Sequence, residues 1–592
     1  MLHRILEQRL RLATLAVLPE ANPEVIQVRP CPDPKFGDYQ TASIISLAKK
    51  RKLNPRQLAT DVLAKLDVSQ WCDKVEIAGA GFLNFRLKIS ALAETLQAAA
   101  RGEHLFYQKT SQPRTVVIDF SSPNVAKPMH IGHIRSTILG DSLAKILRLL
   151  GHRVITDNHI GDWGTQFGKL LVGWKSSLDR AALQKDPIGE MERLYKMVNA
   201  ACESDPAVLE QARQELVKLQ RGDPENLGIW REMIELSQAQ FDAIYKRLGI
   251  QFDYTLGESF YNPKLRAIVQ ELRDKGIARE SDGAICVFSD GSLPPKQDPF
   301  LKQEEGEWKP NPALIQKSDG GFNYTTTDLA TLAHRLETWH PDEILYLTGA
   351  PQQLHFQQLF AIFRRWHPET KVKLAHVWFG SIMGEDGRPF KTRSGETVRL
   401  TDLLDEAEER AFKVVSEKNP ELPEAQRREI ARIVGVGAAK YADLLPNRQS
   451  DYVFSWDRML ALSGNTVPYL QYAYARVRSI FRKGALGEEC VQSSGAGKIA
   501  DVMLGTNEEI ALAKHLLNFG LVLEAVADDY RPNFLCNYLY DLAGHFARFF
   551  ENCPVLKASA AERASRLILC DLTAHVLKQG LETLGIQTLE QM

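Results

Sequence analysis

The sequence predicts an α/β protein of several domains, in which a parallel sheet is preceded by a small α+β domain and followed by an all-α bundle. Three observations predict this fold class. The chain has 592 residues, more than a single hydrophobic core usually organises. Residues 115–157 read as strand, helix and strand, which is how a doubly wound parallel sheet begins. From about Thr401 onward the pattern is almost wholly helical.

The first part, residues 1–112, is expected to be a small mixed domain. Residues 2–17 have helical spacing of apolar side chains, and residues 54–66 open with the Asn-Pro pair of a helix start. Residues 74–87 read as two short strands broken by glycines. The polar stretch 107–114 is the expected linker to the next domain.

The second part, residues 113–400, is expected to hold the sheet. TVVIDF is a β-branched strand, and a Ser/Pro/Asn loop then leads into an amphipathic helix over 129–150. HRVITD supplies the next strand. A charged helical insertion follows at about 175–249, and strand-like segments at 344–350 and 374–382 complete the sheet. The third part, residues 401–592, is expected to be helical, with a loop around 484–497.

Composition indicates a globular protein without a global nucleic-acid signature. The formal net charge is −1, so any polyanion would have to bind a local basic surface. The eight cysteines form no CxxC pair, so we expect free thiols in a reducing compartment and no protein-bound zinc. The N-terminus lacks a signal-peptide pattern, and no unbroken apolar run is long enough to cross a bilayer. We therefore expect a cytoplasmic protein with no membrane partner.

The strongest chemical signal is His130-Ile131-Gly132-His133, which follows the first strand and its loop and begins a helix. Helix N-termini favour phosphate, and two imidazoles three residues apart can both donate hydrogen bonds to a polyphosphate. Gly132 leaves room for a flat base near the backbone. The pattern favours nucleotidyl transfer, in which donors stabilise charge on the α-phosphate. Two unrelated histidines near a helix start are the alternative.

The segments FSSPNVAKPMHIGHIRSTILGD and NHIGDWGTQFGKL resemble the arginine-specific class I aminoacyl-tRNA synthetases, and the similarity runs through essentially the whole chain. The resemblance implies a Rossmann catalytic domain, an N-terminal domain that contacts the tRNA elbow, and a helical anticodon-binding domain. It implies ATP with Mg²⁺, L-arginine and tRNA(Arg) as substrates, transfer to the terminal 2′-hydroxyl, activation that needs bound tRNA, and a monomer.

The second signature of that class, KMSKS, is replaced here by Phe390-Lys391-Thr392-Arg393-Ser394. Phe390 stands where the first lysine is expected, and Arg393 where the second is expected. The resemblance implies a lysine just before the histidine motif instead, and Lys127, three residues before His130, is the expected substitute contact to pyrophosphate. Lys391 and Arg393 are expected to assist catalysis. ATP contacts are expected from Gly132, His130, His133 and Ser394. A solvated basic turn and an exposed loop lysine are the ordinary alternatives.

A guanidinium is planar, forked and permanently charged, so its site needs carboxylates in a fixed geometry. Asp119 ends the first strand, and Tyr324 and Asp328 are four residues apart at a helix start, on one face. By resemblance, Tyr324 and Asp328 hold the guanidinium, while Asp119, Asn124 and Gln352 lie near the α-amino and carboxylate groups. A helix cap for Asp328 and a core position for Tyr324 are the alternatives.

The tRNA contacts are expected mainly on the helix that begins near Thr466. Its aromatic and arginine side chains at helical spacing suit unstacked bases and phosphates, although the pattern alone is explained better by a bundle helix with core tyrosines and solvated arginines. The resemblance favours the first reading. It implies contacts from Tyr469, Tyr472, Arg476, Arg482, Phe550 and Met592, with Phe82 and Asn84 facing a D-loop nucleotide.

Two other functions fit parts of the pattern. A nucleotidylyltransferase with the same histidine motif would need no anticodon-like helical domain and is generally much shorter. A synthetase-derived protein that only binds tRNA would be expected to have lost His130, His133 or the acidic residues, and all are present. Arginine-dependent exchange between ATP and pyrophosphate distinguishes these functions.

Overall fold

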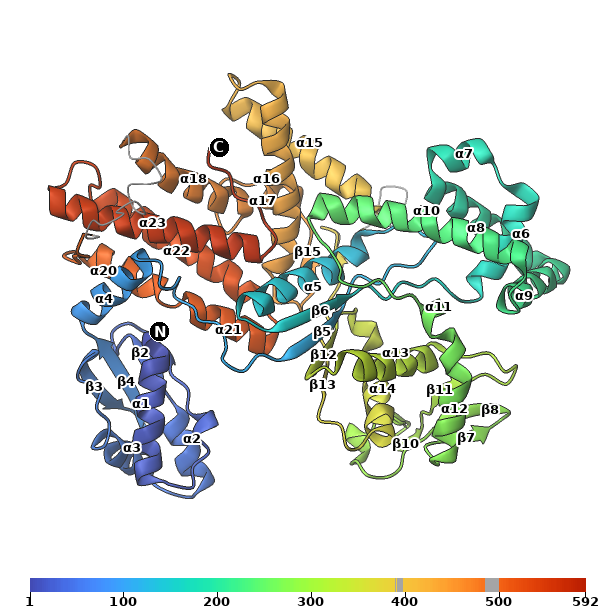
Figure 1. Ribbon diagram of the computed structural model, residues 1–592, viewed down its shortest axis with the longest axis horizontal. Coiled ribbons are helices and arrows are strands. Elements are labelled where there is room, and N and C mark those ends of the chain that lie inside the picture. Colours follow the sequence, from blue (N-terminus) through green and yellow to red (C-terminus); the bar gives the residue numbers. More distant parts are fainter. Residues whose placement is uncertain (389, 391–397, 485–499, 592) are drawn as a thin grey trace. The chain divides into compact units, whose positions relative to one another are not determined.

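The computed structural model describes residues 1–388, 390, 398–484 and 500–591 (Figure 1). The chain forms two compact units. One unit consists of Ser111–Met459, and the other combines Met1–Thr110 with Leu460–Met592. The two ends of the sequence therefore belong to the same unit.

A four-stranded parallel sheet lies at the centre of the Ser111–Met459 unit. Its order is β13-β12-β5-β6, and every neighbouring pair is parallel. The strands are β5 (Thr115–Asp119), β6 (Arg153–Asp157), β12 (Glu343–Tyr346) and β13 (Lys373–His376). Asp119 is in register with both Asp157 and Tyr346, so three neighbouring strands end together. The strands are short and mostly buried, as expected for a sheet covered on both faces.

Three helices bring their first turns to this carboxyl edge of the sheet. α5 (Ile131–Leu149) follows β5, and α14 (Gln353–Trp366) follows β12. α13 (Tyr324–Trp339) precedes β12, and Asp328 of its second turn is within electrostatic reach of Tyr346, the last residue of β12, so the start of α13 lies at the same edge. Ligands of open α/β sheets bind beyond the carboxyl ends of the strands.

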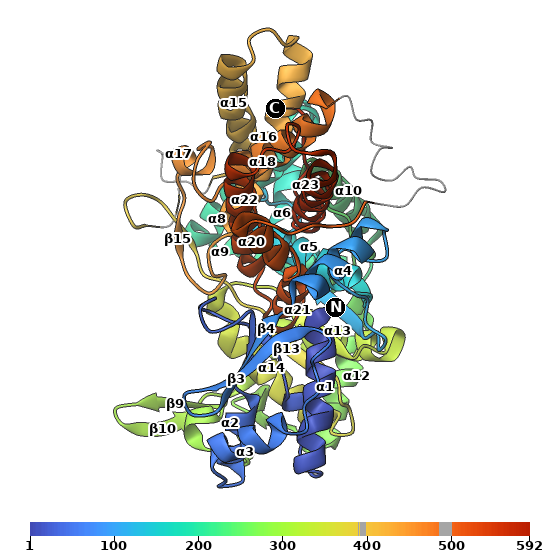
Figure 2. The ribbon, with the colours of Figure 1, turned by 90° about the vertical axis from the view of Figure 1, so that its left-hand side faces the viewer.

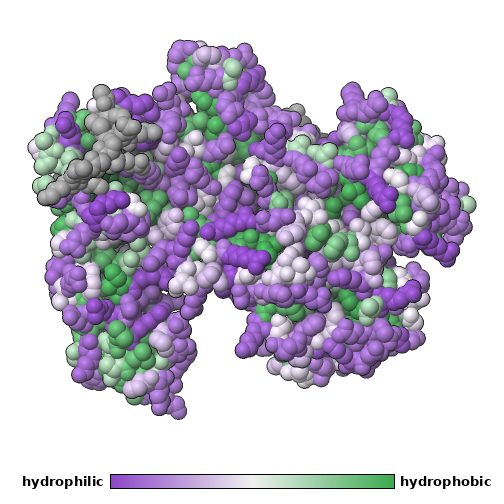
Figure 3. Space-filling view, viewed as in Figure 1, coloured by the Kyte–Doolittle hydropathy of each residue, from purple (hydrophilic) through white to green (hydrophobic). Residues whose placement is uncertain are grey.

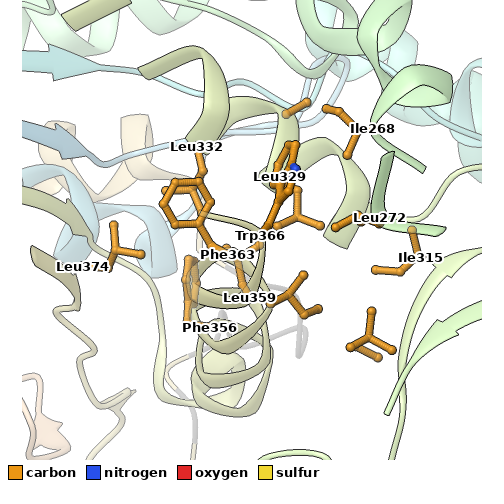
Figure 4. Close-up of a cluster of buried hydrophobic side chains, with 14 of the residues drawn as sticks. Ile268, Leu272, Ile315, Leu329, Leu332, Phe356, Leu359, Phe363, Trp366 and Leu374 are labelled. Atoms are coloured by element: carbon orange, nitrogen blue, oxygen red, sulfur yellow. The ribbon is translucent and has the colours of Figure 1, made fainter. Parts of the chain in front are cut away.

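The largest part of the core lies under α13 and α14 (Figure 4). Leu329 and Leu332 of α13 meet Phe356, Leu359, Phe363 and Trp366 of α14, and all of them are at most 4% exposed. Ile268 and Leu272 of α12 (Leu265–Asp274) and Ile315 of β11 (Ala313–Gln316) join the cluster from outside the sheet. Each fully buried side chain of this kind stabilises the fold by roughly 1.5–3 kcal/mol, so the starts of α13 and α14 are held on a rigid base.

The insertion after β6 is helical, as predicted. It contains α6 (Gln166–Ser177), α7 (Arg180–Lys185), α8 (Pro187–Ser204), α9 (Pro206–Gln220) and α10 (Pro224–Leu248). The last three each begin with an Asp-Pro pair, in which the aspartate side chain accepts a backbone N–H and proline takes the first helical position. Gly249 ends α10 in the left-handed conformation, with φ of 63°.

Smaller elements complete this unit. α11 (Glu258–Tyr261) leads to α12. An antiparallel sheet of order β11-β8-β7 contains β7 (Ala278–Ser281) and β8 (Ala284–Val287), and β9 (Leu301–Glu304) pairs with β10 (Glu307–Pro310). β14 (Ile382–Met383) pairs in parallel with β15 (Tyr452–Val453). α15 (Leu400–Lys418) and α16 (Glu424–Leu444) contact α5, and α17 (Trp456–Met459) ends the unit. The domain boundary expected at residue 400 stays a prediction.

The other unit opens with a four-stranded antiparallel sheet of order β1-β2-β4-β3. Its strands are β1 (Arg29–Pro30), β2 (Tyr39–Thr41), β3 (Cys72–Ala78) and β4 (Phe82–Leu87). The helices predicted from 2 and from 54 are α1 (Leu2–Val17) and α3 (Pro55–Leu63), and Asn54 caps α3 through its side chain. α2 (Ser43–Lys50) and α4 (Ile89–Ala100) are the remaining helices of this part.

The same unit ends in a helical bundle of α18 (Val467–Lys483), α20 (Asn507–Leu516), α21 (Phe519–Asp529), α22 (Asn533–Asn552) and α23 (Ala560–Thr583). α18, α22 and α23 lie side by side in both views (Figures 1 and 2). The loop predicted around 484–497 falls almost wholly outside the described residues. The fold class is confirmed: a parallel-sheet catalytic domain, an N-terminal antiparallel sheet with helices, and a helical C-terminal domain.

One stretch in the described part of the chain, Asn507–Asp529, is long and apolar enough to cross a membrane by composition. It comprises α20 and α21, and more than half of it is buried inside the fold. Core helices pass the same test, so this is weak evidence for a membrane span. On the face seen in Figure 3, hydrophilic residues cover most of the surface and apolar residues show in small separate areas.

Candidate active site

The two motif histidines cap the helix that they begin. His130 is the N-cap of α5, and its Nδ1 accepts a hydrogen bond from the Gly132 N–H at 3.1 Å. The Nδ1 of His133 accepts the N–H of His130, also at 3.1 Å, and the two ring centroids are 4.0 Å apart. Because each Nδ1 accepts a hydrogen bond, the proton of each neutral ring is on Nε2. Both rings therefore offer an Nε2–H donor.

The electrostatic surroundings keep both rings neutral near pH 7. Burial and, to a smaller extent, the neighbouring His130 lower the pKa of His133 to about 3. Burial also lowers the pKa of His130, assisted by the ammonium of Lys127. The histidines are thus neutral hydrogen-bond donors.

The backbone N–H groups at the start of α5 already donate hydrogen bonds within the protein. The N–H of Ile131 donates to the Val398 carbonyl at 3.0 Å, and the N–H of His133 donates to the His130 carbonyl at 2.8 Å. Together with the bond from Gly132, the first three N–H groups of α5 have partners within the protein. An anion here would consequently meet side-chain donors, in contrast to the direct backbone binding that helix N-termini allow.

Gly132 is required by this arrangement. A Cβ at this position would lie 2.9 Å from Cε1 and 3.0 Å from Nδ1 of His130. A side chain would force the His130 ring to shift from its capping position. Gly132 therefore leaves space for the His130 ring. The sequence suggested a second reason for the glycine, which is room for a base.

The loop between β5 and α5 is held in an unusual conformation by buried polar groups. Ser121, Ser122 and Ala126 have φ of 73°, 48° and 61°, in the left-handed region that non-glycine residues rarely adopt. The Ser121 N–H donates to Ser136 Oγ at 2.9 Å, and the Ala126 N–H donates to Ser237 Oγ at 3.0 Å. Strain of this kind persists where surrounding structure imposes it, and it clusters at functional sites.

Lys127 lies on this loop, exposed and beside the histidines. Its ammonium is 5.5 Å from the centroid of the Tyr195 ring of α8, and the Lys169 ammonium is 5.9 Å from the same centroid. A tyrosine of the insertion thus contacts two lysines, one of them three residues before His130. The sequence did not indicate Tyr195 or Lys169, because nothing near them in the chain marks the contact.

The segment of the second signature is only partly described. Lys391, Arg393 and Ser394 lie outside the described residues. Phe390 is described, and its ring centroid is 4.7 Å from that of Phe454. Just after the segment, Arg399 forms a backbone bridge with His130, and the Leu400 N–H donates to the Met129 carbonyl at 2.9 Å. Residues 399 and 400 therefore lie directly beside the first histidine of the motif.

The predicted guanidinium site is on the first turns of α13 and α14. Asp328 Oδ2 is 2.6 Å from His355 Nε2, and the Tyr324 ring stands edge-on to the His355 ring with centroids 4.7 Å apart. Tyr324 is 58% exposed, so it is not a core aromatic. Asn323 is the N-cap of α13, so Asp328 does not cap the helix. His355 is a member of this cluster that the sequence did not indicate.

Glu258, at the start of α11, is a further acidic residue that sequence reasoning missed. Its pKa is raised to about 7, mainly by burial and also by the carboxylates of Asp328 and Asp162, while His159 opposes the rise. Glu258, Asp328 and Asp162 are therefore within electrostatic reach of one another. Gly257 allows the approach, since a Cβ there would lie 2.3 Å from Asp162 Cγ. No spacing rule relates these residues in the sequence.

Asp119 and Asp157, at the ends of β5 and β6, share one partner. Arg335 Nη2 is 2.7 Å from Asp119 Oδ2 and 2.7 Å from Asp157 Oδ2, and Ser122 Oγ donates to Asp119 Oδ1 at 3.0 Å. Asp119 was expected beside the histidine motif, and it does end the strand that leads there. The buried ion pair with Arg335 was not foreseen.

The remaining predicted arginine contacts lie on loops at the same edge. Asn124 is exposed, and its backbone bridges Gly161 of the second quoted segment. A Cβ on Gly161 would lie 2.2 Å from Asn124 Oδ1, so a side chain there would displace the Asn124 amide. Gln352 is exposed at the start of α14, after β12. Among the described residues, no group of three or more His, Cys, Asp and Glu side chains could hold a metal ion.

Three family matches cover most of the chain. Residues 95–456 match "tRNA synthetases class I (R), catalytic domain", residues 470–592 match "DALR anticodon binding domain", and residues 1–87 match "Arginyl tRNA synthetase N terminal domain". The first match alone spans more than half of the chain and contains the site. The chain belongs to the class I arginyl-tRNA synthetases.

Full-length relatives agree with this family. The chain is 45% identical to an arginine–tRNA ligase of Citrobacter koseri, over 99% of both chains, and 44% identical to one of Hahella chejuensis, over 100% of both. An arginyl-tRNA synthetase structure from Plasmodium falciparum has a TM-score of 0.80 at 27% identity and covers 100% of this chain and 99% of its own. One from Thermus thermophilus, at 24% identity, has the same fold, with a TM-score of 0.81 and 100% coverage of both chains.

The predicted tRNA contacts belong to the other unit, and the structure groups some of them. The Arg476 guanidinium lies 4.6 Å from the Phe550 ring centroid, which joins α18 to α22. Tyr472 is 52% exposed on α18, whereas the Tyr469 ring is half-buried, 5.6 Å from that of Tyr540. Arg476, Phe550, Tyr469 and Tyr472 thus mark one region of the bundle.

The other predicted tRNA contacts have more local surroundings. Arg482 Nη1 donates to the Glu590 carbonyl at 2.8 Å, and Met592 lies outside the described residues. Phe82 begins β4, and Asn84 is in the middle of that strand, where it pairs with Gln40 and Glu76. An asparagine at a turn is the ordinary structural alternative to a tRNA contact for Asn84, and its mid-strand position contradicts that alternative. Asn84 is 5% exposed, and Asn84 Oδ1 accepts no hydrogen bond from the described residues.

Proposed function

We propose that this protein activates L-arginine with ATP and transfers the arginyl group to the 3′-terminal ribose of tRNA(Arg). One observation carries the proposal: two neutral imidazoles, whose Nε2–H donors have no hydrogen-bond partner among the described residues, stand at the carboxyl edge of a parallel sheet, and the partly buried carboxylates of Asp328 and Glu258 are on the same side. The first feature suits a polyphosphate, and the second suits a guanidinium. Membership of the arginyl-tRNA synthetases supports the pairing.

In the first step, a carboxylate oxygen of arginine attacks the α-phosphorus of ATP, and pyrophosphate leaves with the electrons of the broken P–O bond. We assign the Nε2–H donors of His130 and His133 to the phosphate oxygens on which charge develops. Lys127 supplies the positive charge for the departing pyrophosphate, with Lys391, Arg393 and Ser394 as further contacts. Mg²⁺ enters as part of the ATP complex, and no protein-bound zinc is proposed.

Arginine is selected at both ends. Its guanidinium is assigned to Asp328 and Tyr324, with Glu258 as an additional carboxylate. His355 holds the Asp328 carboxylate through the 2.6 Å contact. The α-amino group is assigned to the Oδ1 edge of Asp119 and to Asn124, and Gln352 lies near the carboxylate. Lysine, which lacks the planar fork, cannot satisfy carboxylates arranged around a guanidinium.

In the second step, the 2′-hydroxyl of the terminal adenosine attacks the carbonyl of arginyl-adenylate, and AMP leaves. We assign tRNA binding to the bundle region of Tyr469, Tyr472, Arg476 and Phe550, to Arg482 and Met592 near the C-terminus, and to Phe82 and Asn84 in the N-terminal sheet. We further propose that activation requires bound tRNA and that the protein is a cytoplasmic monomer.

Arginine-dependent exchange between ATP and labelled pyrophosphate, with and without tRNA(Arg), tests the function. We expect exchange only when arginine and tRNA are both present. Exchange without arginine would indicate a different nucleotidyl transferase. Binding of tRNA without any exchange would indicate a protein that has kept only recognition. Size-exclusion chromatography with light scattering tests the monomer.

A further inference from the structure

A fully buried arginine lies beneath the ends of three strands. Arg335 of α13 is 0% exposed. Its Nη2 donates to Asp119 at the end of β5 and to Asp157 at the end of β6, each at 2.7 Å. Its Cζ lies 5.3 Å from the ring centroid of Tyr346, the last residue of β12. One guanidinium therefore contacts the carboxyl ends of three neighbouring strands, on the edge where the active site is proposed.

The cluster contains two carboxylates and one guanidinium, so its negative charge is only partly neutralised by Arg335. Two aspartates in register on adjacent strands face one guanidinium. Burial raises the pKa of Asp157, and Arg335 counters this rise. Without the guanidinium, two buried carboxylates side by side could not both stay ionised, and one would take up a proton.

Arg335 also orients Asp119. The Oδ2 atom of that carboxylate is bound to Arg335, and its Oδ1 atom accepts a hydrogen bond from Ser122 Oγ at 3.0 Å. Ser122 belongs to the strained loop that leads to the histidine motif. Each oxygen of the Asp119 carboxylate thus has its own donor, which fixes the orientation of the group. Oδ1 is the oxygen that faces the loop.

We infer that Arg335 is a positioning and specificity residue for the amino-acid substrate. It occupies the Asp119–Asp157 pair with the protein's own guanidinium. The partly buried carboxylates of Asp328 and Glu258 are thereby left for the substrate guanidinium. Arg335 also presents Asp119 to the α-ammonium group in one orientation. A guanidinium can bind any free pair of carboxylates. A site with several carboxylates at one sheet edge therefore needs an internal cation that neutralises the pair not meant for the substrate guanidinium. The inference rests on the proposed function.

The experiment measures arginine-dependent ATP–pyrophosphate exchange, with tRNA(Arg) present, for the wild type, Arg335→Ala and Arg335→Lys. We expect Arg335→Ala to raise the KM for arginine at least about tenfold, as for the loss of a charge-assisted hydrogen bond. The KM for ATP should stay close to the wild-type value. Arg335→Lys keeps a charge but loses the fork, so its KM for arginine should rise less than that of Arg335→Ala.

Methylguanidinium at low millimolar concentration gives a readout that a purely structural role would not produce. In the wild type it competes with arginine at Asp328 and raises the KM for arginine. In Arg335→Ala it fills the vacated position and lowers that KM. In Arg335→Lys the space is filled, so methylguanidinium should raise the KM as in the wild type.

Arg365→Ala is the matched control. Arg365 is a partly buried arginine of α14 that donates to the Phe288 carbonyl at 2.7 Å and pairs with Asp290, away from the strand ends. It should alter thermal stability without changing the KM for arginine. An unchanged arginine KM in Arg335→Lys, or equal increases for arginine and ATP in either Arg335 variant, would overturn the inference. Absence of arginine-dependent exchange in the wild type would instead overturn the proposed function.

Discussion

At the scale of single residues, this site depends on side chains that serve two purposes. His130 and His133 satisfy the backbone of α5 with one ring nitrogen and leave the other nitrogen for a ligand. The bond at Nδ1 determines which nitrogen carries the proton. Burial keeps the rings neutral, so positive charge at the phosphates has to come from elsewhere. Lys127 is the described cation whose charge already acts on His130.

Lys127→Ala should therefore slow adenylate formation far more than it weakens tRNA binding. Loss of a charged contact to the phosphates is expected to lower the exchange rate by about a hundredfold. The dissociation constant for tRNA should stay nearly unchanged. Lys185→Ala, which removes an exposed lysine of α7, is the control and should leave both quantities unaltered. An exchange rate for Lys127→Ala equal to that of the wild type would remove this role.

Glu258 should make arginine binding depend on pH. Its pKa is raised to about 7, so below pH 7 the carboxyl is mostly protonated and does not attract a guanidinium. Affinity for arginine should consequently rise with pH up to about 7, by at most about tenfold per pH unit, and then level off. Arginine binding near pH 7 should release protons. Isothermal titration calorimetry at pH 6, 7 and 8 in buffers of different ionisation enthalpy measures both effects, and Glu258→Gln should abolish them.

At the scale of elements, helix starts determine where the chemistry can occur. α5, α13 and α14 begin at the carboxyl edge of one sheet, and each carries a residue of the site in its first two turns. α5 was predicted to be amphipathic. It is instead buried nearly all round, including Ser136, Thr137 and Asp141. α15 and α16 contact it and come much later in the chain.

Gly132→Ala should lower the rate of ATP–pyrophosphate exchange much more than it lowers the free energy of unfolding. The added Cβ would lie 2.9 Å from the His130 ring, so the ring must shift from its capping position. We expect exchange to fall by about a hundredfold, as for loss of a transition-state donor, and the free energy of unfolding to fall by only about 1 kcal/mol, as for loss of a cap. Exchange kinetics and denaturant unfolding measure the two effects.

Gly228→Ala is the matched control for that substitution. Gly228 lies inside α10, and a Cβ there would meet no atom within 4 Å. Alanine should therefore leave exchange unchanged and stabilise the helix by up to about 1 kcal/mol. Equal losses of activity in Gly132→Ala and Gly228→Ala would show that the first effect does not come from the His130 ring.

At the scale of the whole molecule, the two ends of the sequence form one unit. Asp38 Oδ1 is 2.6 Å from Lys514 Nζ, and Arg4 pairs with Glu524 at 2.7 Å. Gly520 of α21 lies against residue 106, and its N–H donates to the Phe106 carbonyl at 3.1 Å. Segments more than 400 residues apart in sequence are therefore in direct contact within this unit.

Gly520→Ala should weaken the contact between Gly520 and Phe106 and destabilise only the unit that contains them. A Cβ at this position would lie 2.4 Å from the Phe106 carbonyl oxygen, and backbone has to move to accept it. Overpacking of this kind costs about 1–3 kcal/mol. Hydrogen exchange followed by mass spectrometry should show faster exchange in peptides of 1–110 and 460–591. Peptides of 111–459 should be unaffected.

Gly544→Ala in α22 is the control, because its Cβ would meet only Arg548 Nη1, at 3.9 Å. It should leave hydrogen exchange as in the wild type. Faster exchange confined to the peptides around residue 520 would contradict the predicted effect on the N-terminal part of this unit.

The sequence by itself determined the local elements and the family. Helical spacing placed α1, an Asn-Pro helix start placed α3, and a β-branched run placed β5. The histidine motif with its neighbouring segments pointed to arginyl-tRNA synthetases, because these signals lie within a few turns of chain. Only the tertiary structure decided that Glu258 lies near Asp328, that His355 contacts it, and that Arg335 joins Asp119 to Asp157. Burial, pKa and ion pairing depend on which distant segments pack together, and no local pattern encodes that packing.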